Sequence, residues 1–262
     1  MRKAYPSDIP REAYAEIEAQ LLAVTKSTRP RHYDLYDVFC AVLYVLKEGC
    51  TWRALPHDYP KWENCYYHFR RWTKPDDKGE TILDRMLNDL VEIARKEDGR
   101  AEKTTMIIVD SKSVKNVDSA EEKGYDAGKK PSGIKRHIGV DTNGWPHAMH
   151  VSTANITDRE GALSMIEACG DRLEKVRKLL ADGGYTGEKF AEKVKESLGA
   201  EVEIAKRNEL HTFAVIPKRW VVERSFGWLE KCRRLWKNCE RKLQTSLQMF
   251  KLAFVRLLLN RC

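Results

Sequence analysis

The chain carries two kinds of hydrophobic pattern. In its first part apolar residues recur at helical spacing, and the segments 33–49, 61–72 and 81–97 are predicted to be helices. The first of these segments is apolar almost all round and ends at Gly49, so we expect a buried helix there. From residue 104 onward, short apolar runs rich in β-branched residues predict strands. The pattern therefore indicates a helical N-terminal part followed by an α/β part.

Strands and helices of the second part follow one another in an order typical of a mixed sheet flanked by helices. The predicted elements are a strand running into Asp110, a hairpin over 134–155 that turns at Asn143-Gly144, a helix at 158–170, a strand at 175–182, a helix at 187–199, a strand at 201–206 and one longer helix after Pro217. The fold class is therefore predicted to be α/β.

The helical segment 33–72 has the order helix, prolyl turn, helix, with arginines near its end. That order is typical of a helix-turn-helix, in which the second helix contacts DNA. His68, Arg70 and Arg71 are the candidate DNA contacts under this interpretation. A plain helical bundle with its aromatic residues in the core explains the same pattern, and the segment alone leaves both interpretations open.

Positive charge is concentrated near the C-terminus. The formal net charge is +8, and the segment from Lys206 onward holds 14 Lys and Arg against four Glu and no Asp. Such a concentration favours a surface that binds a polyanion, because each cation placed on a phosphate releases condensed counterions. A solvated basic helix face is the alternative, and charge alone does not decide between them.

Several features bear on location and metal content. The seven cysteines have scattered spacings without a C-x-x-C pair, which favours reduced thiols over disulfides or a structural zinc site. No apolar run approaches the roughly 18 residues of a spanning helix, and residues 1–24 include three Glu, unlike a signal peptide. We therefore expect a cytoplasmic protein with no membrane partner.

Two carboxylates stand where apolar strands are predicted to stop. Asp110 follows MIIV, and Asp182 follows KLLA and precedes Gly183-Gly184. An unpaired buried carboxylate is costly, so an acid is expected at such a place where water or a cation reaches it. Strand ends of an α/β sheet converge on one rim, and a divalent cation relieves the repulsion between two acids there. The glycines are expected to let the chain turn away and leave the rim open.

A third oxygen ligand is expected from another element. Glu223 lies among apolar neighbours on the predicted long helix, with Arg219 four residues earlier on the same face. A carboxylate for metal beside an arginine for phosphate suits phosphodiester chemistry. An ordinary Arg-Glu pair on a helix is the alternative, worth only about 0.2–0.5 kcal/mol.

Four motifs together carry a family resemblance. VDSKSVK, GIKRHIGVDTNGWPHAMHVSTANITD, LLADGGYTG and KRWVVERSFGWLEKCRRL resemble the DDE transposases of bacterial insertion sequences, in the insertion-sequence-five group. Residues 31–72 are similar to the N-terminal DNA-binding region of that group. The resemblance implies a helix-turn-helix-like region at 1–78, a connecting helix at 79–100 and a ribonuclease-H-like catalytic domain at 101–262.

The resemblance also implies an activity and a site. Asp110, Asp182 and Glu223 would be the metal-binding catalytic triad, with Mg²⁺ as cofactor and Mn²⁺ as a substitute. The protein would cut double-stranded DNA at the terminal inverted repeats of an element. It would then join the freed 3′-hydroxyls to target DNA, acting as a dimer or a higher assembly on DNA. The residues expected to contact phosphates are Arg219, Lys231, Arg233 and Arg234.

The glutamate helix departs from the signature of wider relatives, Tyr-x-x-Arg-x-x-x-Glu followed seven residues later by Lys. Arg219 and Glu223 match it, whereas Ile216 and Glu230 occupy the Tyr and Lys positions and Lys231 comes one residue late. The same three acids serve a nuclease that never joins strands. A non-catalytic DNA-binding protein with a decayed catalytic domain is a further alternative.

Other polar and aromatic residues are expected to be structural. Asp141 precedes the hairpin turn, where an acid commonly bonds the local backbone. Three hairpin histidines lack metal-ligand spacing, although the first could approach the catalytic rim: His137, His147 and His150. Trp220 and Trp228 are expected in the core, with stacking on a displaced base as the alternative.

Overall fold

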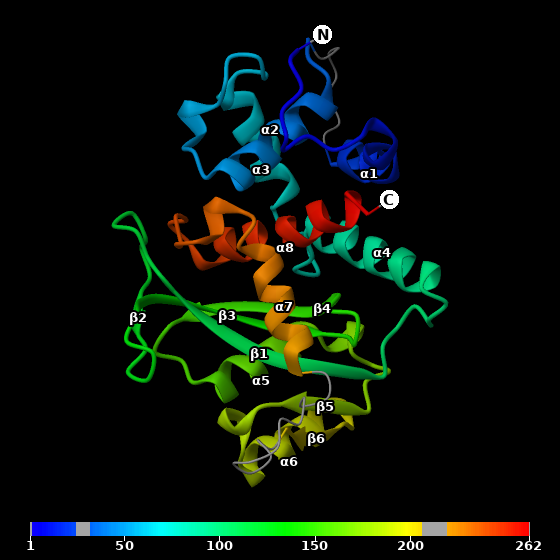
Figure 1. The fold of residues 1–262 in the computed structure, drawn as a ribbon, viewed down its shortest axis with the longest axis vertical. Coiled ribbons are helices and arrows are strands. Elements are labelled where there is room, and N and C mark those ends of the chain that lie inside the picture. The colour runs from blue at the N-terminus through cyan, green and yellow to red at the C-terminus, as the bar shows by residue number, and fades with distance from the viewer. Residues whose placement is uncertain (1, 25–31, 206–218, 262) are drawn as a thin grey trace. The chain divides into compact units, whose positions relative to one another are not determined.

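A computed structural model of the chain describes residues 2–24, 32–205 and 219–261, without the side chain of Arg219. The chain divides into two compact units, which we describe separately (Figure 1). The helical unit comprises residues 1–90, 229–236 and 248–262, and the sheet unit comprises 91–228 and 237–247. The predicted domain borders at 78 and 100 stay predictions; the C-terminal segments 229–236 and 248–262 belong to the same unit as the N-terminal helices.

Helices make up the first unit. Its helices are α1 (Arg11–Ala23), α2 (Leu35–Glu48), α3 (Trp62–Trp72), the first part of α4 (Ile82–Glu97) and most of α8 (Leu243–Leu259), with short 3-10 helices at Trp52–Ala54 and Arg233–Leu235. The side chain of Asp34 accepts a hydrogen bond from the Tyr36 N–H and so caps the start of α2. Gly49 ends α2 in the left-handed conformation, with φ of 73°. The predicted buried helix over 33–49 and the predicted helices over 61–72 and 81–97 are confirmed.

The described structure does not confirm the helix-turn-helix. Helices α2 and α3 pack against each other, but residues 49–61 link them and include a 3-10 helix. A DNA-binding helix-turn-helix has a turn of roughly 3–4 residues, so this link is much longer. The role of α3 in DNA binding stays a prediction.

A mixed sheet forms the second unit (Figure 1). Its strands are β1 (Met106–Lys115), β2 (Gly124–Tyr125), β3 (Ser132–Val140), β4 (Pro146–Thr153), β5 (Lys178–Ala181) and β6 (Glu201–Ile204). The order is β2-β3-β1-β5-β6 with β4 also on β3; β3 is antiparallel to β1, β2 and β4, whereas β1, β5 and β6 are parallel. Helices α5 (Asp158–Ala168), α6 (Glu188–Leu198) and α7 (Arg219–Leu229) accompany the strands. This mixed sheet flanked by helices is as predicted, and it is consistent with a ribonuclease-H-like fold.

The core of the sheet unit lies between the sheet and helices α5 and α6. Ile107 and Val109 of β1 and Leu179 and Ala181 of β5 are buried in it, against residues of both helices. Successive side chains of a strand point to opposite faces. The alternate positions belong to the other face of the sheet. They are Ile108 and Asp110 along β1, and Leu180 and Asp182 along β5 and just beyond it.

Two predicted elements have different bounds. Strand β1 does not stop at Asp110 but continues to Lys115, because its pairing with β3 extends from Ile108 to Lys115. The helix predicted after Pro217 is not one long helix: α7 ends at Leu229, and a separate 3-10 helix follows at Arg233–Leu235. Pro217 itself lies outside the described residues.

None of the described helices combines the length and the apolar character that crossing a bilayer requires.

Candidate active site

Asp110 and Asp182 lie on one face of the sheet at matched positions. Strands β1 and β5 pair in parallel up to Ile108 and Leu180, and each aspartate stands two residues after its paired residue. Side chains two residues apart in a strand point to the same face. The two carboxylates therefore share the face opposite the α5 and α6 core. Parallel pairing ends just before them, although β1 itself continues. The expected convergence of the two acids is thus produced by strand register.

Each carboxylate is partly exposed and bonds the local backbone. Asp110 Oδ1 accepts a hydrogen bond of 2.7 Å from the Ser111 N–H, and Asp182 Oδ1 accepts one of 2.9 Å from the Gly184 N–H. Neither Gly183 nor Gly184 has a positive φ, so the turn after Asp182 does not use the left-handed conformation, and both glycines are exposed. A Cβ on Gly184 would lie 3.0 Å from Asp182 Oδ1, so its glycine leaves room for the carboxylate.

A small, open pocket lies at the two aspartates. Its lining residues are Ile108, Val109, Asp110, Leu180, Ala181, Asp182, Ala205 and Val222. The lining is therefore mostly apolar, with two carboxylates on one wall. Val222 comes from α7, which brings that helix to the same pocket.

Glu223 is the residue after Val222 in α7, and its side chain is exposed. The third predicted acid thus directly follows, in the sequence of α7, a residue that lines the pocket. Within the described ranges, no three His, Cys, Asp or Glu side chains are grouped closely enough to hold a metal ion. The structure therefore brings Asp110 and Asp182 to one pocket, whereas a ligand role for Glu223 stays a prediction.

Tyr185 and Asp158 are additional polar groups near Asp110 that the sequence did not single out. Tyr185 is buried, and burial together with the negative charges of Asp110 and Asp158 raises the pKa of its hydroxyl well above the usual value. Asp158 lies 2.8 Å from Lys135 Nζ; burial opposes its charge, but the Lys135 and Ser111 hydrogen bonds lower its pKa. The only signal in the sequence was their position within two of the quoted motifs, Tyr185 in LLADGGYTG and Asp158 at the end of STANITD.

His137 belongs to the opposite face and does not line the pocket. It pairs with Ser111 across β1 and β3, is fully buried, and its Nε2 lies 3.0 Å from Ser152 Oγ. Burial, and then the nearby His150, lower the pKa of His137 to about 3, so the ring is neutral at neutral pH. This fits the structural interpretation and not an approach to the catalytic rim.

The predicted phosphate contacts do not share one helix. Arg219 begins α7, but its side chain is outside the described part. Lys231 follows the end of α7, and its carbonyl accepts a hydrogen bond from Lys47. Arg233 pairs with Glu48 at 3.2 Å, whereas Arg234 is 8% exposed and donates to the Cys50 carbonyl. Of the two departed signature positions, Ile216 lies outside the described residues and Glu230 is exposed just after α7.

The candidates on α3 differ in accessibility. His68 is buried and lies 3.1 Å from the Tyr33 hydroxyl, which indicates a packing role. Arg71 is exposed, and its guanidinium donates two hydrogen bonds to the Val24 carbonyl. Arg70 is exposed on the same helix. Arg70 is therefore the α3 candidate that the fold leaves most accessible.

Expected core residues of α7 behave differently from one another. Trp228 is half-buried rather than part of the core, and it stacks on Trp145 with 5.4 Å between ring centroids. The prediction that Trp220 lies in the core is wrong, because Trp220 is 49% exposed and the Arg224 guanidinium lies 4.6 Å from its ring centre.

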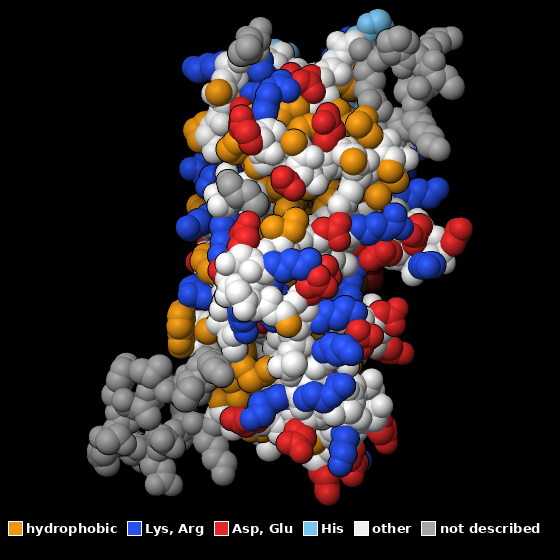
Figure 2. Space-filling model, turned by 90° about the vertical axis from the view of Figure 1, so that its right-hand side faces the viewer, with side chains coloured by type: hydrophobic (Ala, Val, Ile, Leu, Met, Phe, Trp, Pro, Cys, Tyr) orange, Lys and Arg blue, Asp and Glu red, His pale blue; other side chains and the backbone are white. Residues whose placement is uncertain are grey.

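On the face shown in Figure 2, the described Lys and Arg side chains are interspersed with Asp and Glu.

Comparison with known proteins identifies the family. Residues 101–258 match the family described as "Transposase DDE domain", and residues 9–77 match "Putative transposase of IS4/5 family". A relative from Burkholderia cepacia, "Putative transposase for insertion sequence element IS402", is 37% identical over 117 residues, which are 42% of this chain and 55% of the relative. The chain thus spans about half the length of that curated relative. Since the DDE-domain match covers more than half of the chain, this protein belongs to the DDE transposase family of insertion sequences.

Proposed function

We propose that this transposase cuts DNA at the ends of an insertion sequence and joins the freed 3′-hydroxyls to target DNA. Asp110, Asp182 and Glu223 are the catalytic acids of this proposal. The observation that carries it is the placement of Asp110 and Asp182 on one face of two parallel strands, lining a single pocket with Val222 of the glutamate helix.

The donor set fits a divalent cation. Asp110 and Asp182 offer hard carboxylate oxygens, both partly exposed, and such oxygens are the ligands that Mg²⁺ prefers. Glu223 on α7 is the proposed third ligand, with Mg²⁺ as the natural ion and Mn²⁺ as a substitute. Bound ions of this kind activate the attacking oxygen and stabilise charge on the leaving oxygen.

The reaction consists of two balanced displacements at phosphorus. In the first, a water oxygen bonds to phosphorus, the bond to the 3′ oxygen breaks, and the proton released by water is balanced by the one the 3′ oxygen takes up. In the second, that 3′-hydroxyl attacks a phosphodiester of target DNA and a target 3′-hydroxyl leaves. Each step exchanges one P–O bond for another, so no external energy source is needed.

The protein side chains supply position and charge. The lining beside the aspartates includes the apolar side chains of Ile108 and Leu180. Exposed cations, Arg70 and Arg233 among them, are proposed to contact DNA phosphates and so fix the register of the duplex. Joining two element ends to one target also requires two active sites, so we propose a dimer or a higher assembly on DNA.

The test uses the full chain with labelled duplex that carries the ends of its own element. We expect Mg²⁺-dependent cleavage by the wild type, its loss in Asp110→Asn, Asp182→Asn and Glu223→Gln, and unchanged cleavage in Asp171→Asn, which removes an exposed carboxylate. DNA binding should survive in all four variants.

The alternatives give different results in the same assay. Binding without metal-dependent cleavage by the wild type would overturn the enzyme and favour a non-catalytic DNA-binding protein. Cleavage without joining of pre-cleaved ends to a target plasmid would instead identify a nuclease. Cleavage that survives Glu223→Gln would remove Glu223 from the triad.

A further inference from the structure

The turn that joins β3 to β4, residues 141–145, is built around a fully buried carboxylate. Asp141 Oδ1 accepts hydrogen bonds of 2.8 Å from the Asn143 N–H and 3.1 Å from the Trp145 N–H. This local bonding is what the sequence led us to expect of an acid before a hairpin. We call residues 141–145 the docking turn, because helix α7 packs on it.

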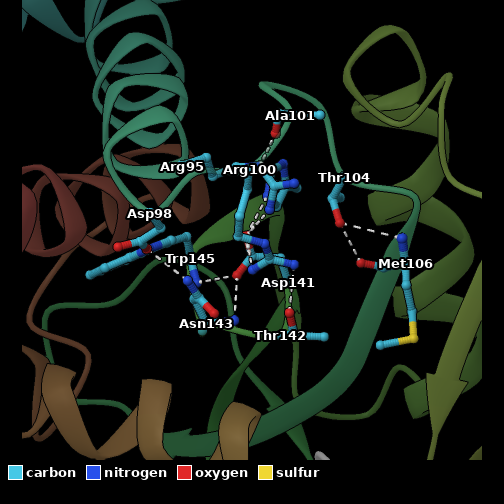
Figure 3. A network of polar contacts seen from close by, with 12 residues as sticks. Arg95, Asp98, Arg100, Ala101, Thr104, Met106, Asp141, Thr142, Asn143 and Trp145 are labelled. Atoms are coloured by element: carbon cyan, nitrogen blue, oxygen red, sulfur yellow. Dashed lines mark hydrogen bonds and ion pairs between the residues drawn. The ribbon is translucent and has the colours of Figure 1, made fainter.

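Three positively charged or titratable side chains surround the other oxygen of Asp141. Arg95 Nη1, on α4, donates a hydrogen bond to Oδ2, and Arg95 Nε donates one of 2.7 Å to the Ala101 carbonyl (Figure 3). Arg100 Nη1 and His147 Nε2 lie 3.7 and 3.4 Å from the same oxygen. A buried charge held by several partners at once gives the docking turn few alternative conformations.

Helix α7 contacts three consecutive residues of the docking turn. Arg224 Nη2 donates to the Asn143 carbonyl at 2.8 Å. Ser225 Oγ lies 2.9 Å from the Gly144 carbonyl and 3.0 Å from the Val221 carbonyl, and its single proton is shared between these two acceptors. Trp228 stacks on Trp145 with an angle of 30° between the rings. These contacts are spaced along one side of the helix, so they resist both sliding and rotation of α7.

Gly144 is required for this close approach. Its φ is +88°, and a Cβ at this position would lie 2.7 Å from Ser225 Oγ and 3.1 Å from the Trp228 ring. A side chain there would have to displace α7 or distort the turn.

Docking of α7 bears directly on Glu223. Glu223 lies between Val222, which lines the pocket with Asp110 and Asp182, and Arg224, which is bonded to the docking turn. An α-helix turns 100° and rises 1.5 Å per residue, so a change of one residue in docking would turn Glu223 well away from its present direction.

We propose that the docking turn positions Glu223 relative to Asp110 and Asp182, with Gly144 and Ser225 as positioning residues that touch neither metal nor DNA. The inference rests on the proposed function, because it concerns the third acid of that site. Residues that orient metal ligands from outside typically change metal affinity by 10–100-fold when replaced.

Binding of Mn²⁺ to the full chain, without DNA, is the decisive measurement. Gly144→Ala and Ser225→Ala change no charge; we expect each to weaken Mn²⁺ binding by about tenfold in calorimetry, at a temperature where both remain folded. Affinity for element-end DNA should not change. The matched controls are Gly227→Ala, on α7 with no atom within 4 Å of the added Cβ, and Ser164→Ala, exposed on α5.

Each outcome has a distinct meaning. Wild-type binding of Mn²⁺ that is lost in Asp110→Asn supports the proposed site, and a tenfold loss in both docking variants but in neither control supports the inference. Equal Mn²⁺ affinity in wild type and docking variants overturns the inference alone. Absence of Mn²⁺ binding by the wild type overturns the proposed metal site and the inference with it. Hydrogen exchange of α7 amides, expected to be faster in Gly144→Ala, checks docking independently of metal.

Discussion

Gly161 of α5 lies directly against the ring of His137. A Cβ on Gly161 would stand 2.0 Å from Cε1 and 2.2 Å from Nε2 of that buried histidine. A glycine inside a helix normally lowers stability by about 0.5–1 kcal/mol relative to alanine. Here the sign reverses, because added atoms overpack the core. We predict that Gly161→Ala lowers the free energy of unfolding by about 1–3 kcal/mol in chemical denaturation.

Gly227 provides the opposite case for the same substitution. It is also helical, in α7, and nothing lies within 4 Å of an added Cβ. Gly227→Ala should therefore raise the melting temperature slightly. A stabilising Gly161→Ala would show that α5 is not packed on His137 as described.

The buried carboxylate of Asp141 makes stability depend on pH. Burial opposes its charge, but hydrogen bonds from His147 and from the Asn143 and Trp145 N–H groups lower its pKa from 3.8 to about 2. The unfolded chain therefore binds the proton first. This contribution, about 2 kcal/mol, is complete above pH 4 and is lost as the pH falls towards 2.

Replacing that carboxylate tests the pH dependence. Between pH 4 and pH 2, Asp141→Asn should lose about 2 kcal/mol less unfolding free energy than the wild type, although it starts from a lower value. Asp171→Asn, which removes an exposed carboxylate, should follow the wild-type profile. Parallel profiles for Asp141→Asn and wild type would contradict the assignment.

An ion pair in the helical unit joins residues far apart in sequence. Lys251 Nζ of α8 lies 2.5 Å from Asp84 Oδ1 of α4, and both side chains are at most 10% exposed. Lys251→Met leaves a buried charge without its cation and should lower the free energy of unfolding by about 3–5 kcal/mol. Adding Asp84→Asn should recover part of the loss. Lys242→Met removes an exposed lysine and should change stability by less than about 0.5 kcal/mol.

Arg70 and Arg234 were predicted as DNA contacts, and the structure separates their expected effects. Arg70 is exposed, so Arg70→Gln should weaken DNA binding and reduce the slope of log affinity against log salt by about 0.9 without changing the melting temperature. Arg234 is buried against the Cys50 carbonyl, so Arg234→Gln should mainly lower the melting temperature. Fluorescence anisotropy at several salt concentrations checks both. An unchanged slope in Arg70→Gln would argue against a DNA contact by Arg70.

Local sequence determined most of the individual elements. Gly49 ends α2 and Gly199 ends α6, both in the left-handed conformation and both at positions that the sequence predicted; the Asp34 cap at the start of α2 is equally local. The hairpin at Asn143-Gly144 formed as expected. These features depend on hydrogen bonds and dihedral preferences within a few residues, which a sequence displays directly.

Motifs in the sequence also selected the family and the two aspartates, but not their surroundings. An apolar strand before an acid is visible in one dimension, whereas the pocket shared by Asp110 and Asp182 depends on the register between β1 and β5. For the same reason the sequence placed the end of β1 at Asp110, although pairing with β3 carries the strand further.

Burial of side chains and contacts between distant residues depended on the tertiary structure. The burial of Arg234 against the Cys50 carbonyl and the contacts of Arg224 and Ser225 with the docking turn depend on residues more than 80 positions away. The sequence by itself determined most of the elements, the family and the candidate acids, because these follow from local pattern and motif. Only the fold decided which side chains meet, because packing and burial are set by contacts between distant segments.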